Sequence, residues 1–136
     1  MTQEQINQYD AEGRPHGRWE FTTCGGTFLE KGYYHHGDKH GFWESYVVNG
    51  TILTSTYNFH YGKLHGYCKI YNTDGTLSKK LYYYHGKLHG ISEDYYWPSG
   101  TLWRRYFFHH GTPKSVHKAW DSKGNLYSKQ YFLNLR

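Results

Sequence analysis

Histidine is the residue type in this chain that most invites chemistry. The sequence has 11 histidines, and two pairs, His36 with His40 and His85 with His89, are spaced four residues apart. On a helix this spacing would place both imidazoles on one face, as in a zinc site. Each pair instead surrounds a glycine turn, and no cysteine or carboxylate recurs beside it. We therefore predict turn histidines that hydrogen-bond local backbone, with no metal and no cofactor. A row of histidines would still make the protein respond to pH between about 5 and 7.

Other combinations of reactive residues do not form a catalytic signature. Neither a G-x-S-x-G nucleophile turn nor an H-E-x-x-H zinc motif occurs, and the G-x-x-x-G stretches lack the Lys-Ser/Thr of a phosphate loop. Glu20, Glu44 and Glu93 recur at one position of the repeat described below, where Lys69 and Lys118 stand in other copies. Pairing with basic residues of a neighbouring strand is the expected role of these glutamates. The sequence predicts a protein that is not an enzyme, with no catalytic residues.

Composition limits the fold and the compartment. Aromatic residues make up 21% of the chain, with 5 Trp, 16 Tyr and 7 Phe, while the formal net charge is only +5. Rings can supply the buried apolar area that aliphatic residues supply in most proteins. The two cysteines, Cys24 and Cys68, form no metal-binding or disulfide pattern and are expected to be reduced. Since no long apolar run occurs and the start of the chain is polar, we expect a cytoplasmic protein.

Glycine positions reveal the elements that must carry these side chains. Glycines four residues apart recur with a period of 24 or 25 residues, and a second glycine series with the same period falls between them. The pairs are Gly13 with Gly17, Gly37 with Gly41, Gly62 with Gly66, and Gly86 with Gly90, and the second series is Gly26, Gly50, Gly75, Gly100 and Gly124. Six residues beyond the Thr or Asn that follows the second-series glycine, every copy has a ring: Tyr33, Tyr57, Tyr82, Phe107 and Tyr131. Two kinds of glycine turn therefore alternate along the chain.

The segments between the turns have the length and composition of β-strands. They are rich in Tyr, Thr, Trp and Phe, and the dipeptides Asn49-Gly50 and Asp74-Gly75 are strong hairpin signals. We predict an all-β fold, an elongated antiparallel meander of about five β-hairpin repeats in a largely single-layer twisted sheet. The expected domains are a polar N-terminal segment, 1–8, and one repeat domain, 9–136, whose last repeat acts as a cap. The glycines assigned to structural turns are Gly37, Gly41, Gly50, Gly62, Gly66, Gly75, Gly86, Gly90 and Gly100.

The segment from Tyr71 to Gly90, which joins Tyr-Asn-x-x-Gly-Thr-Leu to Tyr-x-x-Gly-Lys-Leu-His-Gly, resembles the MORN repeat. It resembles more closely the bacterial variant in the toxin-antitoxin system YwqK family antitoxins. The likeness extends from Tyr9 to about Phe132, and departures occur at Ser115, Trp97-Pro98 and Tyr61. The resemblance implies a β-hairpin repeat without an active site that serves as a protein-binding scaffold. In that family some members are described as antitoxins or immunity proteins, and eukaryotic MORN proteins are linked to scaffolding and acidic phospholipids.

Exposed aromatic rows lead us to expect a protein–protein interaction module, antitoxin-like or scaffolding, whose partner the sequence does not identify. Large aromatic residues are the commonest energetic anchors of protein interfaces. We expect the anchors in the middle repeats, at Trp43, Tyr46, Tyr71, Tyr83, Trp103 and Phe108.

Two other functions remain open at this point. Basic residues interleaved with rings suit anionic phospholipid or single-stranded nucleic acid; they are Lys31, Lys79, Lys80, Arg104, Arg105 and Lys129. Alternatively, unpaired first and last strands suit a structural or virion-type subunit that forms a homo-oligomer through its sheet edges.

Overall fold

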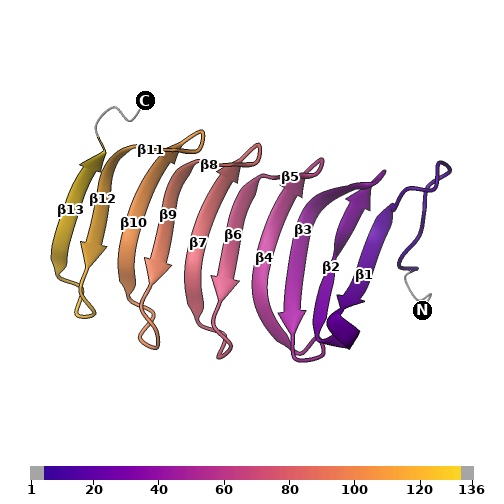
Figure 1. Ribbon diagram of the computed structural model, residues 1–136, viewed down its shortest axis with the longest axis horizontal. Coiled ribbons are helices and arrows are strands. Elements are labelled where there is room, and N and C mark those ends of the chain that lie inside the picture. The colour runs from indigo at the N-terminus through magenta and orange to yellow at the C-terminus, as the bar shows by residue number, and fades with distance from the viewer. Residues whose placement is uncertain (1–4, 133–136) are drawn as a thin grey trace.

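Glycine turns separate short aromatic strands along the whole sheet, and in the computed structural model these strands form one open antiparallel layer (Figure 1). The structure describes residues 5–132. Spatial order follows chain order through β1 (Gly17–Thr23), β2 (Phe28–His35), β3 (Asp38–Val47), β4 (Ile52–His60), β6 (Gly66–Tyr71), β7 (Leu77–Tyr84), β9 (Gly90–Tyr95), β10 (Leu102–His109), β12 (Ser115–Trp120) and β13 (Leu126–Phe132). The predicted single-layer meander of hairpins is confirmed.

Three two-residue strands mark the points where the chain turns back toward the next repeat. They are β5 (Lys63–Leu64), β8 (Lys87–Leu88) and β11 (Thr112–Pro113), which pair with β4, β7 and β10. A short 3-10 turn, Cys24–Gly26, joins β1 to β2. All nine glycines assigned to turns have positive φ. At the turn from β2 to β3, His36 (φ 44°) and Gly37 (φ 93°) both take this conformation, which matches the twist of a hairpin.

The better-buried face of the sheet, here called the Trp43 face, is organised around one tryptophan. Trp43 is 1% exposed, and its indole Nε1 donates a hydrogen bond of 2.9 Å to the carbonyl oxygen of Tyr33. Its ring meets the ring of Tyr34 edge-on, with centroids 5.0 Å apart. On strands in register with β3, the same face buries the smaller residues Ser55, Cys68, Ser92, Asp94 and Ala119. Burial raises the pKa of the Cys68 thiol to about 11, so this cysteine is an inert core residue.

A buried carboxylate ties the third and fourth hairpins together on this face. Asp94 of β9 accepts hydrogen bonds from the Arg104 guanidinium at 2.8 Å and the Tyr106 hydroxyl at 2.6 Å. The ammonium of Lys79 lies 3.4 Å from its other oxygen. Burial, followed by the hydrogen bond to Asp94, raises the pKa of Tyr106 well above its usual range. The acid–base pairing expected between neighbouring strands is therefore present, although this acid was not among the glutamates singled out in the sequence.

The N-terminal segment lies along the outer edge of β1. The backbone N–H of Asn7 donates to the carbonyl oxygen of Arg18, and the Asn7 side-chain oxygen accepts from the N–H of Glu20, both at 2.9 Å. The indole of Trp19 donates to the carbonyl oxygen of Gln8 at 3.0 Å. Asn7 therefore satisfies two edge groups that a further strand would otherwise use.

Candidate functional site: a histidine rim and an exposed aromatic row

Four histidines connect successive repeats along one rim of the sheet. Each stands before the second glycine of a pair, and its Nδ1 accepts a hydrogen bond from the backbone N–H of the first positive-φ residue in the next turn. The bonds run from His36 to His16 (3.0 Å), from Tyr61 to His40 (3.2 Å), from His85 to His65 (3.2 Å) and from His110 to His89 (3.1 Å). Because an N–H can only donate, these four Nδ1 atoms must be unprotonated.

A second backbone bond fixes each of these turns to the preceding repeat. In each turn the backbone N–H of the glycine donates to a carbonyl oxygen of the preceding repeat at 2.7–2.8 Å. The pairs are Gly37 with Pro15, Gly62 with Lys39, Gly86 with Leu64, and Gly111 with Leu88. Each turn is therefore held by two bonds, one to backbone and one to histidine. The predicted histidine-to-backbone bond exists, but it reaches a backbone group 20 or 21 residues away rather than a local one.

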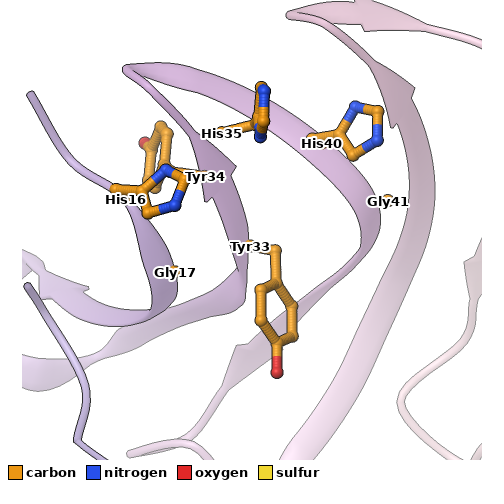
Figure 2. Close-up of a pocket in the computed structure, with 7 residues that line it drawn as sticks. All are labelled: His16, Gly17, Tyr33, Tyr34, His35, His40 and Gly41. Atoms are coloured by element: carbon orange, nitrogen blue, oxygen red, sulfur yellow. The ribbon is translucent and has the colours of Figure 1, made fainter. Parts of the chain in front are cut away.

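The rings of these turns form a continuous array, which we call the histidine rim. It contains His16, His35, His36, His40, His60, Tyr61, His65, Tyr84, His85, His89, His109 and His110, and neighbouring ring centroids lie 4.2–6.4 Å apart. Figure 2 shows its first part, where His16, His35 and His40 line an open pocket together with Tyr34, which lies behind His16, and Tyr33, which lies below them. Ten of the 11 histidines lie in this rim.

Three histidines come together at each end of the rim. The ligand nitrogens of His16, His35 and His36 lie within 4.8 Å of one another, and so do those of His89, His109 and His110. At the second cluster, burial and then the charges of His110, His89 and Lys114 lower the pKa of His109. These clusters are the places in the described part of the chain that could hold a metal ion.

Asp10 stands behind the first cluster. Its Oδ2 lies 2.7 Å from Nδ1 of His36 and 2.9 Å from Nε of Arg14. Burial alone would raise the pKa of Asp10, but the hydrogen bonds from the Arg14 backbone, from His36 and from the Arg14 side chain outweigh it and hold the pKa well below its usual range. Sequence reasoning missed this carboxylate because 26 residues separate it from His36.

The opposite face of the sheet, the Tyr67 face, carries a line of exposed apolar side chains that we call the exposed row. It consists of Tyr33, Phe42, Tyr67, Ile91 and Phe107, which are 43–51% exposed. The register places them at one level, since Phe42 pairs with Asn58, whose amide bonds the carbonyl of Tyr67, while Tyr67 pairs with Tyr82 and Ile91 with Phe107. The half-buried Asn58 and Tyr82 occupy this level on β4 and β7. Between Tyr33 and Phe42 lies a shallow hollow whose other side chains are Arg18, Lys31 and Glu44.

Charged residues form the next line on this face. Glu20 pairs with Lys31 and Lys31 with Glu44, while at the other end Arg105 bonds Glu93 at 2.9 Å. In the centre the cross-strand neighbours are two lysines, Lys69 and Lys80, and the Lys80 ammonium lies 4.6 Å from the Tyr67 ring centroid. The middle of the exposed row is therefore flanked by positive charge.

The six anchors expected from the sequence do not form one surface. Trp43 is buried, so its ring is a core element and is not available to a partner. Tyr83 lies across from Gly66 and Phe108 across from Gly90 on the Trp43 face, whereas Tyr46 and Tyr71 pair with residues of the Tyr67 face. Trp103 donates to the hydroxyl of Tyr127 at 3.1 Å, beside a bulge, and the Arg104 guanidinium lies 4.0 Å from its ring centroid. The five other than Trp43 are half-buried.

A simple sequence signal could have found part of the exposed row. Phe42, Tyr67 and Ile91 each follow the second glycine of a pair directly. Because the second glycine has a positive φ in each of these repeats, the side chain that follows it lies at an equivalent position each time.

Neither the known protein-family models nor the curated proteins include a match to this sequence. Across residues 5–132, no helix has the length and apolar character needed to cross a membrane.

Proposed function

We propose that this chain is a non-enzymatic protein-interaction module and that its Tyr67 face binds an acidic segment of another protein. The observation that carries the proposal is the exposed row, in which five large apolar residues, 43–51% exposed, lie at one level of the Tyr67 face beside a line of charged residues. Isolated exposed apolar residues are ordinary, but several of them at one level, interrupted here by Asn58 and bordered by polar groups, are typical of a binding surface. Tyr and Phe also supply rigid contact area at a low cost in conformational entropy.

Charge gives the expected chemistry of the partner. Lys69 and Lys80 face each other beside Tyr67, the acid opposite Lys80 on β9 is Glu93, which Arg105 engages, and the chain has a formal net charge of +5. An acidic segment laid along the row would meet rings at its apolar positions and lysines at its carboxylates. Complementary charge of this kind mainly speeds association and sets specificity. The resemblance to MORN repeats and YwqK-type antitoxins supports the same class of function, a scaffold or a neutralising partner.

Binding of anionic lipid or nucleic acid has less support in the geometry. The basic residues grouped in the sequence divide between the faces, because Lys80 and Arg105 lie on the Tyr67 face while Lys79 and Arg104 lie on the other. Arg104 and Lys79 are engaged by Asp94, and Arg105 by Glu93. A phosphate-rich ligand would have to compete with these pairs. The side chain of Lys129 lies outside the described residues.

Assembly through sheet edges also has less support. Asn7 hydrogen-bonds the Arg18 carbonyl oxygen and the Glu20 N–H on the edge of β1, and the Gln8 carbonyl oxygen accepts a hydrogen bond from the Trp19 indole. A second copy pairing with β1 would have to displace this segment.

The test compares two matched variants. One replaces Phe42, Tyr67 and Phe107 by Ser; the control replaces three other highly exposed rings, Tyr9, Trp97 and Tyr127, by Ser. A protein captured from the native host by the wild-type chain would be purified, and its affinity for all three chains measured by calorimetry. We expect at least about 150-fold weaker binding for the row variant, since three anchors that each contribute more than about 1 kcal/mol together contribute more than about 3 kcal/mol, and little change for the control.

Two results would count against the proposal. One is equal binding by the row variant and the wild type while both remain folded. The other is saturable binding of anionic vesicles or oligonucleotides that survives the row substitutions and falls steeply with salt, because this would assign function to the basic residues instead.

A further inference from the structure

The two ends of the histidine rim differ from its middle in one respect. Both end turns have histidine at both positions before the glycine, as His35-His36 and His109-His110. The two middle turns have one histidine and one tyrosine, as His60-Tyr61 and Tyr84-His85. The backbone is the same in all four, since residues 36, 61, 85 and 110 have φ between 44° and 46°. Turn geometry alone therefore does not require the additional histidines at the ends.

With the histidine of the preceding repeat, each end turn gathers three imidazoles. The ligand nitrogens within each cluster lie within 4.8 Å of one another. We propose that His16, His35 and His36, and separately His89, His109 and His110, each bind a divalent first-row transition metal ion such as Zn²⁺ or Cu²⁺. Neutral imidazole is a preferred ligand of these ions. This inference does not depend on the exposed row, which lies on the face of the sheet rather than at its rim.

Exposure allows the side chains to adopt coordination geometry. His35, His36, His109 and His110 are exposed, whereas His16 and His89 are half-buried. In the first cluster the rings of His16 and His36 are stacked, with centroids 4.2 Å apart and planes at 24°. In two stacked rings the nitrogen lone pairs point in parallel directions, so one ring must rotate before both nitrogens can bind the same ion. The exposed rings can do so without displacing a packed core.

Asp10 gives the first cluster the outer support that metal-binding histidines commonly have. The Asp10 carboxylate lies 2.7 Å from Nδ1 of His36 and therefore holds a proton on that nitrogen. Nε2 of His36 is left with its lone pair and is directed away from the carboxylate. A carboxylate behind a ligand histidine fixes its tautomer and raises its basicity, and loss of such a partner typically lowers affinity 10–100-fold.

His16 and His89 can contribute only at a cost. Nδ1 of His16 accepts the His36 N–H, and Nδ1 of His89 accepts the His110 N–H. In a neutral ring the proton is then on Nε2, so a metal ion can bind either nitrogen only if that hydrogen bond opens. The two exposed histidines of each cluster therefore provide the first two ligands, and water fills positions that the third does not take.

This proposal differs from the sequence-based expectation of no metal site, which stays a prediction. That expectation considered pairs four residues apart, such as His36 with His40, and noted that no cysteine or carboxylate recurs beside them. The clusters instead join histidines of successive repeats, and Asp10 comes from a third segment of the chain.

The middle turns of the chain supply conservative test substitutions. His36→Tyr copies Tyr61 and His109→Tyr copies Tyr84, so both changes place a residue that the same turn already accepts elsewhere. His35→Tyr and His110→Tyr are second variants of the same design. The matched control is His85→Tyr, which makes the same change in a turn outside both clusters.

The experiment is calorimetric titration of the full-length, untagged protein with Zn²⁺, with folding checked by circular dichroism. We expect two equivalents for the wild type, one for His36→Tyr, one for His109→Tyr, none for the double variant, and two for His85→Tyr. Asp10→Asn should weaken binding at the first site 10–100-fold. Asp121→Asn is its control, because Asp121 makes a similar turn, accepting from Lys123 and Asn125, without a histidine.

The proposal is overturned if the wild type shows no saturable Zn²⁺ binding. It is also overturned if His85→Tyr lowers the stoichiometry as much as the cluster variants do, since binding would then be spread over the whole rim. Loss of an equivalent in His36→Tyr and His35→Tyr, but in neither variant of the second cluster, would retain the first site and refute the second.

Discussion

Replacing Gly32 by alanine is the most direct test of how this sheet forms a core without a second layer. A Cβ atom added at Gly32 would lie 2.5 Å from Cγ and Cε2 of Trp43 and closer still to Cδ2. Gly32 is also the one glycine of 16 whose φ is not positive. The substitution therefore adds volume beneath the indole without forcing the backbone into an unfavourable conformation.

The expected loss of stability follows from what Trp43 must give up. Forcing an added methyl group into a packed site costs about 1–3 kcal/mol. If the indole shifts, its 2.9 Å bond to the carbonyl of Tyr33 weakens, at about 0.5–1.5 kcal/mol. Alanine recovers about 0.5–1 kcal/mol because glycine loses more backbone entropy on folding. The net expectation is about 2 kcal/mol of destabilisation, or a Tm lower by about 6–10 °C for a chain of this size.

The assay is urea and thermal unfolding of four proteins: the wild type, Gly32→Ala, Trp43→Leu and the double variant. Because leucine removes the ring that the new methyl group meets, the alanine should cost little in the Trp43→Leu background. The coupling energy between the two positions should be about 2 kcal/mol. An equal cost of Gly32→Ala in both backgrounds, or no cost in either, would show that close approach of the indole to Gly32 does not hold this face together.

Further predictions concern individual bonds. His40→Ala removes the acceptor of the Tyr61 N–H and should cost about 1 kcal/mol in urea unfolding, with faster hydrogen exchange at that amide; unchanged exchange would contradict the proposed role of the bond. The pKa of Asp74 is lowered by hydrogen bonds, first from the Thr76 hydroxyl, then from the Thr76 backbone and then from the Trp97 indole. The stability that the ionised Asp74 carboxylate contributes is therefore complete above the unfolded pKa of 3.8 and is lost as pH falls below that value. Asp74→Asn should therefore flatten the acid side of the stability profile, and an unchanged acid profile would refute this. The hydrogen bond to Glu44 raises the pKa of Tyr46 to about 12, and Glu44→Gln should bring the ultraviolet titration of this phenol back toward 10.

The fold was predictable because the glycine spacing and the residue composition between the glycines both indicate β-hairpins. Glycines with positive φ occur at a fixed period, and the residues between them favour strands, so hairpin order and strand pairing follow from local signals. Because the connections are short, each strand pairs with the next strand along the chain, and the sheet is therefore a meander. The same reasoning placed Gly37 and Gly62 in equivalent turns, and the structure gives both a positive φ.

The assignment of side chains to faces was less predictable, and the second hairpin shows why. Counting forward from the Gly-Thr turns aligns Tyr57 with Tyr33, but Tyr57 pairs with Trp43 on the buried face. The register shifts opposite Ser45 and Tyr46, where β4 has one extra residue, Thr54, whose hydroxyl bonds the Ser45 carbonyl. A bulge reverses the face of every residue beyond it. Asn58, rather than Tyr57, therefore occupies the position that Tyr33 has in the first hairpin.

The contacts of the histidine rim were beyond sequence reasoning for a different reason. The partner of His40 is a backbone N–H at Tyr61, and backbone groups have no signature in a sequence. Asp10 reaches His36 only because the N-terminal segment folds along β1. Contacts of this kind depend on how successive repeats stack, which local patterns do not specify.

The two faces of the sheet differ in how much their side chains contribute to folding, and this difference bears on why the exposed row is apolar. The Trp43 face contains the most buried ring and the Asp94 network, so it supplies much of the tertiary stabilisation. Phe42 and Phe107 are 51% and 43% exposed, and truncating them would sacrifice only part of the roughly 1.5–3 kcal/mol that a fully buried side chain of this size contributes. Serine or threonine would suit a solvated strand at these positions and would be less prone to aggregation. Because folding gains little from rings there, the proposed contact with another protein would account for their apolar character.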